Sequence, residues 1–207
     1  MRVIFLGDSL TWRFDWERAL NGLSASPPDD GESAYHRQAS AQAQSQDILQ
    51  ARNFGVDGDT TGDILHRLER VAAARPDMVF LQAGINDLFS FPFLPDEAAL
   101  HSLLKRHREI WRRLLKDCPG LRLYICSLLP ISHRLDGDGS FNIPIRAFNV
   151  LLAEAADAAG LPYVDLYPAL GNEKGELAPQ YDEDGVHLLP AAYVVWLECI
   201  KPFLQSK

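Results

Sequence analysis

The chain has 207 residues, 47% of them hydrophobic and 23% charged, and its formal net charge is -8. This length and composition are typical of one globular domain with a buried core, and we expect residues 1–207 to form a single domain. The acidic balance argues against a nucleic-acid surface, which would be basic. The three cysteines are widely spaced and lack a metal-ligand pattern, so they predict free thiols and no zinc site.

The sequence shows neither a secretory signal nor a membrane span. The first apolar run ends at once in Gly7-Asp8-Ser9, which makes it too short for a signal peptide. The most apolar later stretch, Ala191 to Ile200, contains Glu198 and is too short to cross a bilayer. We therefore expect a cytoplasmic protein, and the sequence leaves open whether it forms a homo-oligomer.

Short apolar or β-branched runs alternate with longer segments of helical period along the chain. This alternation predicts an α/β fold in which helices cross over between the strands of a parallel sheet. Residues 24–46 are rich in Ser, Ala, Gln and Pro, which predicts a surface insertion of unknown role. The predicted strands are, in order, Arg2–Leu6, a weak strand ending at Arg52–Asn53, Met78–Gln82, Leu121–Ser127 and Tyr163–Leu166.

The clearest helical period covers Leu100 to Leu115, where the apolar side chains form one stripe. Five basic residues fall on the other side of this helix, and we interpret them as solvated surface: Lys105, Arg106, Arg108, Arg112 and Arg113. Other segments are predicted as a loop over 132–141, a helix from Pro144 to Gly160 capped by Asn142, and a last helix from Pro190 that Pro202 ends or kinks.

Small and polar residues follow the predicted strands. Because ligands of an open parallel sheet bind at the carboxyl ends of the strands, the loops at those ends are the candidates for a site. Four such loops are present: Gly7-Asp8-Ser9-Leu10, Asn53-Phe54-Gly55-Val56-Asp57-Gly58-Asp59-Thr60-Thr61, Gly84-Ile85-Asn86-Asp87 and Asp184-Gly185-Val186-His187.

Ser9 lies on the turn where the first strand passes into a helix, which is a position suited to a nucleophile. A serine hydroxyl needs a neighbouring base, normally an imidazole held by a carboxylate. His187 and Asp184 supply both groups, since Gly185 between them allows the carboxylate to fold back onto the ring. The alternative is structural: Asp184 caps the following helix and His187 is a packed or exposed loop histidine. Asp8 is expected to hold the turn that aims Ser9.

Acyl transfer also needs hydrogen-bond donors at the oxygen that becomes negative. Asn86 offers a side-chain amide, and Gly58 offers a main-chain N–H that can approach a substrate closely at positive φ. Each residue also has a structural alternative, a simple turn at Asn86 and a tight bend at Gly58.

Taken together, the four loops resemble the four blocks of the SGNH hydrolases, also called the GDSL esterase/lipase family. The second loop is especially similar to that of platelet-activating-factor acetylhydrolase-like and bacterial thioesterase/lysophospholipase-like members. The blocks extend from near the first residue to near the last, so the resemblance covers the whole chain. It implies a flavodoxin-like three-layer α/β/α sandwich with a five-stranded parallel sheet, and a serine esterase without a metal or other cofactor.

The resemblance also implies a role for each site residue. Ser9 would be the nucleophile, His187 the base and then the acid, and Asp184 the group that orients the imidazole. The oxyanion hole would consist of the main-chain N–H groups of Ser9 and Gly58 and the side chain of Asn86.

The expected substrate is a small to medium carboxylic ester, cleaved through an acyl-enzyme, and carbohydrate O-acetyl esters are the second candidate. Phe89 and Phe91 follow Asn86 and are candidates for the wall of an acyl pocket. Trp12 is a candidate for the other side of the cleft, and His133 for a contact to the leaving group. The alternative for these residues is ordinary packing.

Two other classes of function use the same loops. In the first class, carboxylates near strand ends hold Mg²⁺ for phosphoryl hydrolysis, although this leaves Ser9, Asn86 and His187 without a role. These carboxylates are Asp8, Asp59, Asp87 and Asp184.

The second class is a non-catalytic binding module. A nucleotide is disfavoured as its ligand because no glycine-rich phosphate loop is present.

Overall fold

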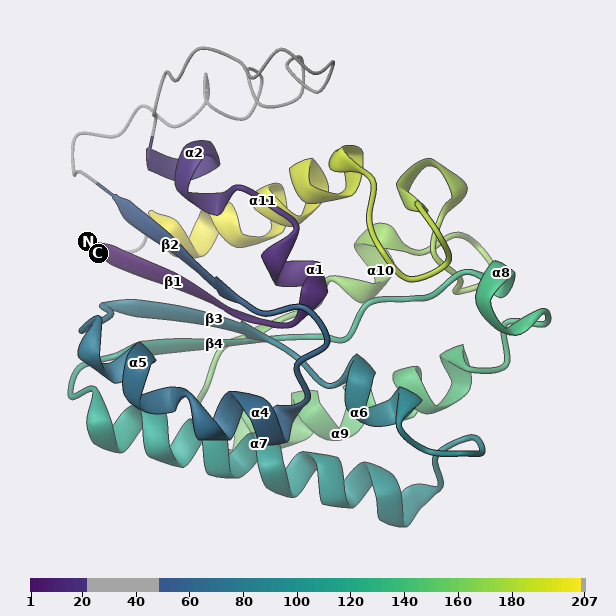
Figure 1. Ribbon diagram of the computed structural model, residues 1–207, viewed down its shortest axis with the longest axis horizontal. Helices are drawn as coiled ribbons and strands as arrows, with labels where there is room; N and C mark the ends of the chain where they lie inside the picture. The colour runs from purple at the N-terminus through teal and green to yellow at the C-terminus, as the bar shows by residue number, and fades with distance from the viewer. Residues whose placement is uncertain (22–48, 206–207) are drawn as a thin grey trace.

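The protein is described from a computed structural model, and the described residues are 1–21 and 49–205. The predicted insertion at residues 24–46 lies outside them. The described chain forms a three-layer α/β/α sandwich in which a five-stranded parallel sheet lies between two layers of helices (Figure 1). The predicted fold class is therefore confirmed.

The strands stand in the order β2-β1-β3-β4-β5, which is the flavodoxin-like order. β1 pairs with both β2 and β3, so the chain builds the sheet outward from β1 first in one direction and then in the other. A ligand site is expected outside the carboxyl ends of β1 and β3, where this direction reverses. The strands are β1 (Arg2–Gly7), β2 (Gln50–Gly55), β3 (Met78–Gln82), β4 (Arg122–Cys126) and β5 (Tyr163–Val164).

Helices cover both faces of the sheet, as Figure 1 shows. The upper layer in that view contains α1 (Ser9–Trp12), α2 (Trp16–Asn21) and α11 (Pro190–Leu204). The lower layer contains α4 (Thr61–His66), α5 (Leu68–Ala73), α7 (Glu97–Asp117) and α9 (Asn142–Ala158). Short helices add to the loops: α6 (Ile85–Phe89), α8 (His133–Asp136), α10 (Tyr167–Leu170) and the 3-10 helix η1 (Pro179–Tyr181).

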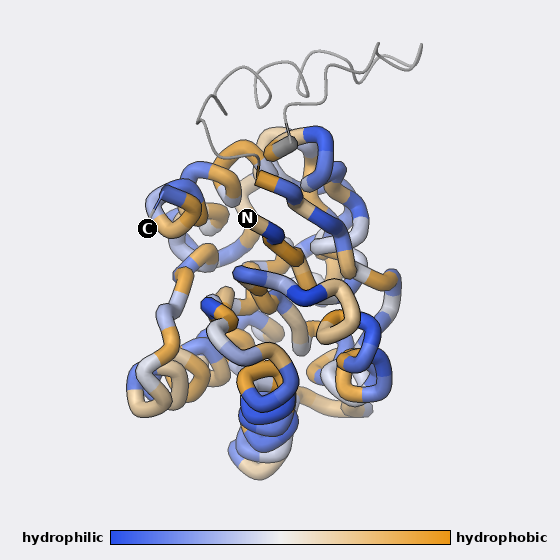
Figure 2. The backbone as a smooth tube through the Cα atoms, turned by 90° about the vertical axis from the view of Figure 1, so that its left-hand side faces the viewer, coloured by the Kyte–Doolittle hydropathy of each residue, from blue (hydrophilic) through white to orange (hydrophobic). Residues whose placement is uncertain are grey.

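The central strands are buried on both faces, as is usual for a parallel sheet between helices. A row of aromatic rings crosses one face: Trp16 stacks on Phe5 with ring centroids 3.9 Å apart, and Phe80 lies between Phe5 and Tyr124 at 5.4 and 4.7 Å. Such rings bury large apolar areas and add favourable pair contacts. In Figure 2, α7 is seen end-on at the bottom, with its orange side toward the sheet and its blue side outward.

The apolar stripe of α7 faces the core as predicted except at Leu115, which is 41% exposed, and the prediction for its basic side is wrong in part. Arg106 contacts Thr61 and Asp87, and Arg113 donates to the main-chain oxygen of Leu65 at 3.1 Å. α4 packs against α7 and supplies Thr61 and Leu65 as acceptors for these guanidinium groups, and α6 supplies Asp87. Helical period alone cannot reveal such acceptors, because they come from other elements.

Several boundaries also differ from the prediction: β2 continues to Gly55, β4 ends at Cys126, and β5 ends at Val164 instead of Leu166. α9 begins at Asn142, which does not cap it; its amide instead exchanges hydrogen bonds with the main chain of Ile131, at 3.0 and 2.8 Å. The predicted loop after β4 contains α8. α11 continues to Leu204, so of the two predicted effects of Pro202 an end of the helix is wrong and a kink stays a prediction. Gly160 ends α9 at φ +66°, as its prediction as a stop requires.

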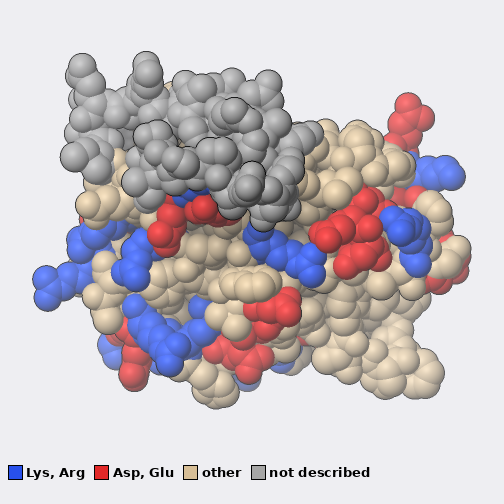
Figure 3. Space-filling model, turned by 45° about the horizontal axis from the view of Figure 1, so that its top comes forward, with Lys and Arg blue, Asp and Glu red and all other residues tan. Residues whose placement is uncertain are grey.

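Charged side chains of both signs share the surface. On the face in Figure 3, Lys and Arg lie beside Asp and Glu in small groups, and the described residues form no continuous basic area there. Among the helices of residues 1–21 and 49–205, none has the length and hydropathy of a membrane span.

Two glycines allow α1 to lie directly over the ends of β1 and β2. A methyl group at Gly7 would collide with the main-chain oxygen of Gln82 and the hydroxyl of Thr11, and one at Gly55 would collide with the main chain of Trp12. No side chain therefore fits at either position. The close contact sets the height of α1, and with it the height of its first residue, above the sheet.

We predict that Gly7→Ala lowers the free energy of unfolding by about 3 kcal/mol, because main-chain atoms must move to admit the methyl group. Gly62→Ala in α4 is the matched control. There a methyl group meets only the Thr60 hydroxyl at 3.4 Å, and alanine is favoured over glycine in a helix by roughly 0.5–1 kcal/mol. Urea unfolding followed by circular dichroism measures both variants, and similar effects at the two sites would contradict the steric argument.

Candidate active site

Three predicted catalytic residues form a continuous chain of hydrogen bonds. The hydroxyl oxygen of Ser9 lies 3.2 Å from Nε2 of His187, and Nδ1 of His187 lies 2.7 Å from a carboxylate oxygen of Asp184. Because the ionised carboxylate can only accept, Nδ1 carries the hydrogen and Nε2 presents its lone pair to the serine hydroxyl. This arrangement can activate the hydroxyl as a nucleophile.

Asp184 is held ionised by hydrogen bonds. Burial opposes its charge, but donation from the side chain and main chain of His187 and from the main chain of Val186 outweighs burial and lowers the pKa of Asp184 to about 2. The alternative that Asp184 caps the next helix is wrong, because Leu189 stands at that position and no side chain caps α11. The carboxylate is thus free to stabilise an imidazolium.

The loop that carries the imidazole is tied to its surroundings at several points. Gly185 adopts φ +106°, donates to the carboxylate of Asp182 at 2.6 Å and accepts from the main chain of Ser132 at 2.8 Å. An ion pair of 2.9 Å joins Arg13, which follows α1, to Glu183 on this loop. These contacts link the loop both to α1 and to the segment after β4.

Ser9 is held at the first position of α1. Asp8 caps this helix by accepting the N–H of Leu10 at 3.0 Å, which confirms that it holds the turn. Tyr193 of α11 donates to the main-chain oxygen of Leu10 at 2.9 Å. At the other end, the amide of Asn53 donates to three main-chain oxygens, those of Thr11, Trp12 and Phe14.

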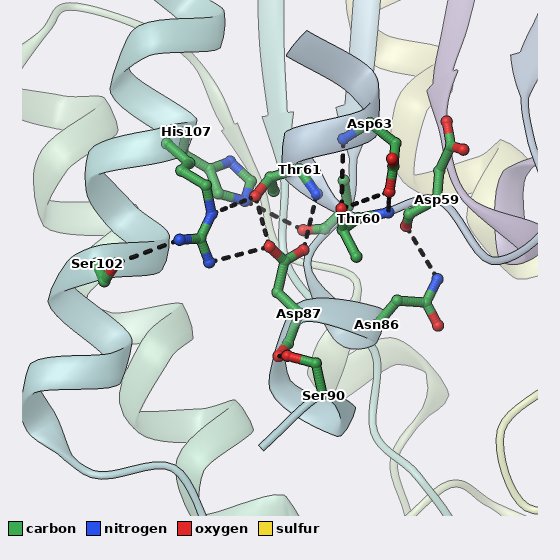
Figure 4. A network of polar contacts seen from close by, with 11 residues as sticks. Asp59, Thr60, Thr61, Asp63, Asn86, Asp87, Ser90, Ser102 and His107 are labelled. Carbon is green, nitrogen blue, oxygen red and sulfur yellow. Dashed lines mark hydrogen bonds and ion pairs between the residues drawn. The ribbon is translucent and has the colours of Figure 1, made fainter. Parts of the chain in front are cut away.

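Each of the three predicted oxyanion donors has a hydrogen free for a ligand. Gly58 adopts φ +77° in a turn closed by a hydrogen bond from Asp59 to Val56, and an added methyl group there would meet no atom within 4 Å. Its main-chain N–H and that of Ser9 donate to no other described residue. Asn86 donates one amide hydrogen to the main-chain oxygen of Asp59 at 3.0 Å, which leaves the second (Figure 4).

Asp87 anchors the short helix α6, which carries Asn86. Its carboxylate accepts from the main chain and hydroxyl of Thr61, at 2.8 and 2.6 Å, and forms an ion pair of 3.0 Å with Arg106 of α7 (Figure 4). The Asp87 side chain is buried, so partners of this kind are needed to offset the loss of hydration. The network fixes α6 against α4 and α7.

His107 of α7 supports the turn before α6. This buried imidazole lies with Nε2 at 3.1 Å from the main-chain oxygen of Ala83, to which it must donate. Desolvation lowers the pKa of His107 to about 4, so the ring is neutral at physiological pH. It acts as a structural support for the end of β3.

The profile of the GDSL-like lipase/acylhydrolase family matches residues 5–195. The chain belongs to this family. The resemblance seen in the sequence is therefore confirmed, and this GDSL protein is a hydrolase that acts on esters. Comparison with curated proteins finds no match.

Solved structures with the same fold come from several bacteria. A GDSL-like lipase from Bacteroides thetaiotaomicron is 22% identical with a TM-score of 0.70, covering 99% of this chain and 87% of that chain. A lipase/acylhydrolase from Enterococcus faecalis is 20% identical at 0.66, covering 98% and 94%. A mutant of an acetylxylan esterase from Geobacillus stearothermophilus is 19% identical at 0.71, covering 100% and 94%. These similarities confirm the fold of the GDSL hydrolase.

The residues predicted to bind substrate lie in different surroundings. Trp12, the last residue of the short helix α1 that begins at Ser9, is 54% exposed. Phe89 packs against Phe141 with ring centroids 5.0 Å apart, and Phe91 is half-buried. His133 pairs through Nδ1 with Glu176 at 3.0 Å. Their contact with substrate stays a prediction.

The carboxylates considered for a magnesium site are engaged separately. Asp59 pairs with Arg67 at 2.6 Å, Asp87 with Arg106, and Asp184 with His187. Within the described residues, no group of three or more His, Cys, Asp or Glu side chains is arranged to hold a metal ion.

Four residues that contact the segments carrying the site could not be predicted from the sequence, because their spacing forms no motif: Arg67, Arg106, His107 and Glu183.

Asp8 remains buried with one carboxylate oxygen that has no partner among the described residues. Desolvation raises the pKa of Asp8 to about 7 despite its hydrogen bond from Leu10. The folded protein therefore holds a proton on this carboxyl that the unfolded chain releases at lower pH.

We predict that this proton makes the protein less stable as pH rises from about 4 to 7, since in this range the folded state binds more protons than the unfolded state. Asp8→Asn keeps an oxygen for the Leu10 N–H and removes the titration. Its free energy of unfolding should gain about 2 kcal/mol relative to the wild type between pH 5 and pH 8. Urea unfolding at both pH values measures the difference, and a constant difference would mean that Asp8 is ionised throughout.

Proposed function

We propose that this GDSL hydrolase is a serine esterase that cleaves small to medium carboxylic esters through an acyl-enzyme at Ser9. The observation that carries the proposal is the continuous hydrogen-bond chain from Asp184 through His187 to Ser9, with the imidazole 3.2 Å from the hydroxyl. This chain of groups lies at the edge of the sheet where ligands of such folds bind. We propose residues 1–207 as one catalytic domain, and the three free cysteines favour the reducing cytoplasm as its location.

In the first half-reaction, Ser9 attacks the ester carbonyl and gives its proton to Nε2 of His187. Asp184 stabilises the imidazolium that forms, and the negative carbonyl oxygen accepts hydrogen bonds from Ser9, Gly58 and Asn86. The imidazolium then protonates the leaving alcohol, and the acyl group stays on the serine oxygen. In the second half, His187 takes a proton from water, the hydroxide attacks the acyl group, and the acid leaves as Ser9 regains its proton.

Carbohydrate O-acetyl esters are a second candidate substrate. The acetylxylan esterase from Geobacillus stearothermophilus has the same fold at a TM-score of 0.71. Trp12, three positions after the nucleophile, exposes an indole that can stack on a sugar ring. Nε2 of His133 bonds to none of the described residues and can therefore meet a sugar hydroxyl.

The mechanism predicts that Ser9→Ala lowers turnover of a nitrophenyl ester by roughly 10³- to 10⁶-fold, because the nucleophile is lost. A fluorophosphonate should label the wild type and not Ser9→Ala, as mass spectrometry of the intact protein can check.

Asn86→Ala should lower kcat for the same ester by about 10²- to 10³-fold, since one oxyanion donor is removed while the nucleophile remains.

EDTA is the control for the rival metal-dependent mechanism. Turnover should be unchanged by the chelator, because no step above uses a metal. Loss of activity with EDTA, together with failure of the fluorophosphonate to label Ser9, would overturn the proposal.

A substrate panel separates the two candidate substrates. We expect kcat/KM to be highest for nitrophenyl esters of short to medium acyl chains, from acetate to octanoate, and lower for acetylated xylooligosaccharides. The reverse order would assign the enzyme to carbohydrate deacetylation. In that case Trp12→Ala should raise KM for the acetylated sugar more than for nitrophenyl acetate, which lacks the sugar ring.

A further inference from the structure

One guanidinium group joins the segments that carry the proposed oxyanion donors. Arg67 stands at the break between α4 and α5, and its side chain is only 14% exposed. Its three nitrogens all donate: Nε to the carboxylate of Asp59 at 2.6 Å, Nη1 to the main-chain oxygen of Phe54 at 2.7 Å, and Nη2 to that of Gly7 at 2.8 Å. Each acceptor belongs to a different part of the site.

The three acceptors lead directly to the catalytic groups. Gly7 is the last residue of β1 and stands two positions before Ser9. Phe54 lies at the end of β2, where the chain turns into the loop that carries Gly58. Asp59 follows Gly58, and its main-chain oxygen accepts the amide of Asn86. Ser9, Gly58 and Asn86 are thus all connected to the same side chain.

We propose that Arg67 is a positioning residue, which sets the spacing between Ser9 and the oxyanion donors without touching the substrate. This inference rests on the proposed function of those donors. A guanidinium is a rigid planar fork that can hold three acceptors at fixed angles, whereas an ammonium on a flexible stem cannot. Small displacements of reacting groups are enough to slow an enzyme strongly.

A purely structural role of Arg67 is the alternative, because its loss would leave the buried Asp59 carboxylate and two main-chain oxygens without their donor. The two roles differ in what they change. Loss of fold stability alone lowers the melting temperature and leaves kcat of the folded enzyme intact. Loss of spacing lowers kcat and weakens binding of a tetrahedral analogue, while KM changes little.

The test compares Arg67→Lys with Arg113→Lys. Both changes keep the positive charge, and Arg113 also donates to a main-chain oxygen, that of Leu65, but has no contact with the oxyanion segments. We expect Arg67→Lys to lower kcat by about 10- to 100-fold, with KM within threefold, and to weaken inhibition by an alkyl boronic acid by a similar factor. Arg113→Lys should leave both within twofold of the wild type.

Asp59→Asn is the second variant, for use if Arg67→Lys does not fold. This variant keeps the guanidinium and both main-chain acceptors. It replaces the charge-assisted hydrogen bond from Nε of Arg67 with a weaker one to a neutral amide, so kcat should fall about tenfold. Wild-type kcat and boronic acid affinity in folded Arg67→Lys, or in Asp59→Asn, would overturn the inference. Ser9→Ala distinguishes this outcome from failure of the proposed function: retention of most of the wild-type activity in Ser9→Ala refutes the esterase mechanism itself, whatever the Arg67 variants do.

Discussion

α1 packs directly over the carboxyl ends of β1 and β2, with glycine at both positions where a side chain would collide with it. This contact leaves no freedom in where the helix begins, and the first residue of the helix is Ser9. His187 comes from a loop far along the sequence, yet its imidazole lies within hydrogen-bond distance of the serine. The geometry of the proposed triad therefore depends first on a steric constraint between a strand end and a helix.

The ionisable groups around the site are divided into pairs with separate tasks. Asp184 pairs with the imidazole of His187, Asp59 holds Arg67 in place, and Asp87 fixes α6 through Arg106. Buried carboxylates are tolerated when a cation and hydrogen bonds replace their hydration. Asp8 is the exception, since one of its oxygens has no partner, and it responds by holding its proton. Although the protein is acidic overall, the carboxylates around the site are paired or protonated. The site can therefore accommodate the negative charge that the proposed reaction places on the carbonyl oxygen.

The sequence was sufficient to predict the five strands and the fold family, and it named residues that the fold brings together, because Gly7-Asp8-Ser9-Leu10 and its companion loops are local patterns at strand ends. It was not sufficient for contacts between elements. Arg106 occupies the polar side of α7 by period, but the carboxylate of Asp87 turns it inward. Asn142 has the chemistry of a cap, but its amide exchanges hydrogen bonds with the main chain of Ile131 instead. Such choices depend on which partners the tertiary fold brings near.

The hydrogen bond between Ser9 and His187 spans 178 positions of the chain. Tyr193 of α11, which donates to the main-chain oxygen of Leu10, follows the histidine in the chain. Without the loop that carries His187, Ser9 lacks its proposed base. In the proposed mechanism Ser9 is activated only when these distant segments have come together, so esterase activity would report that the fold has formed.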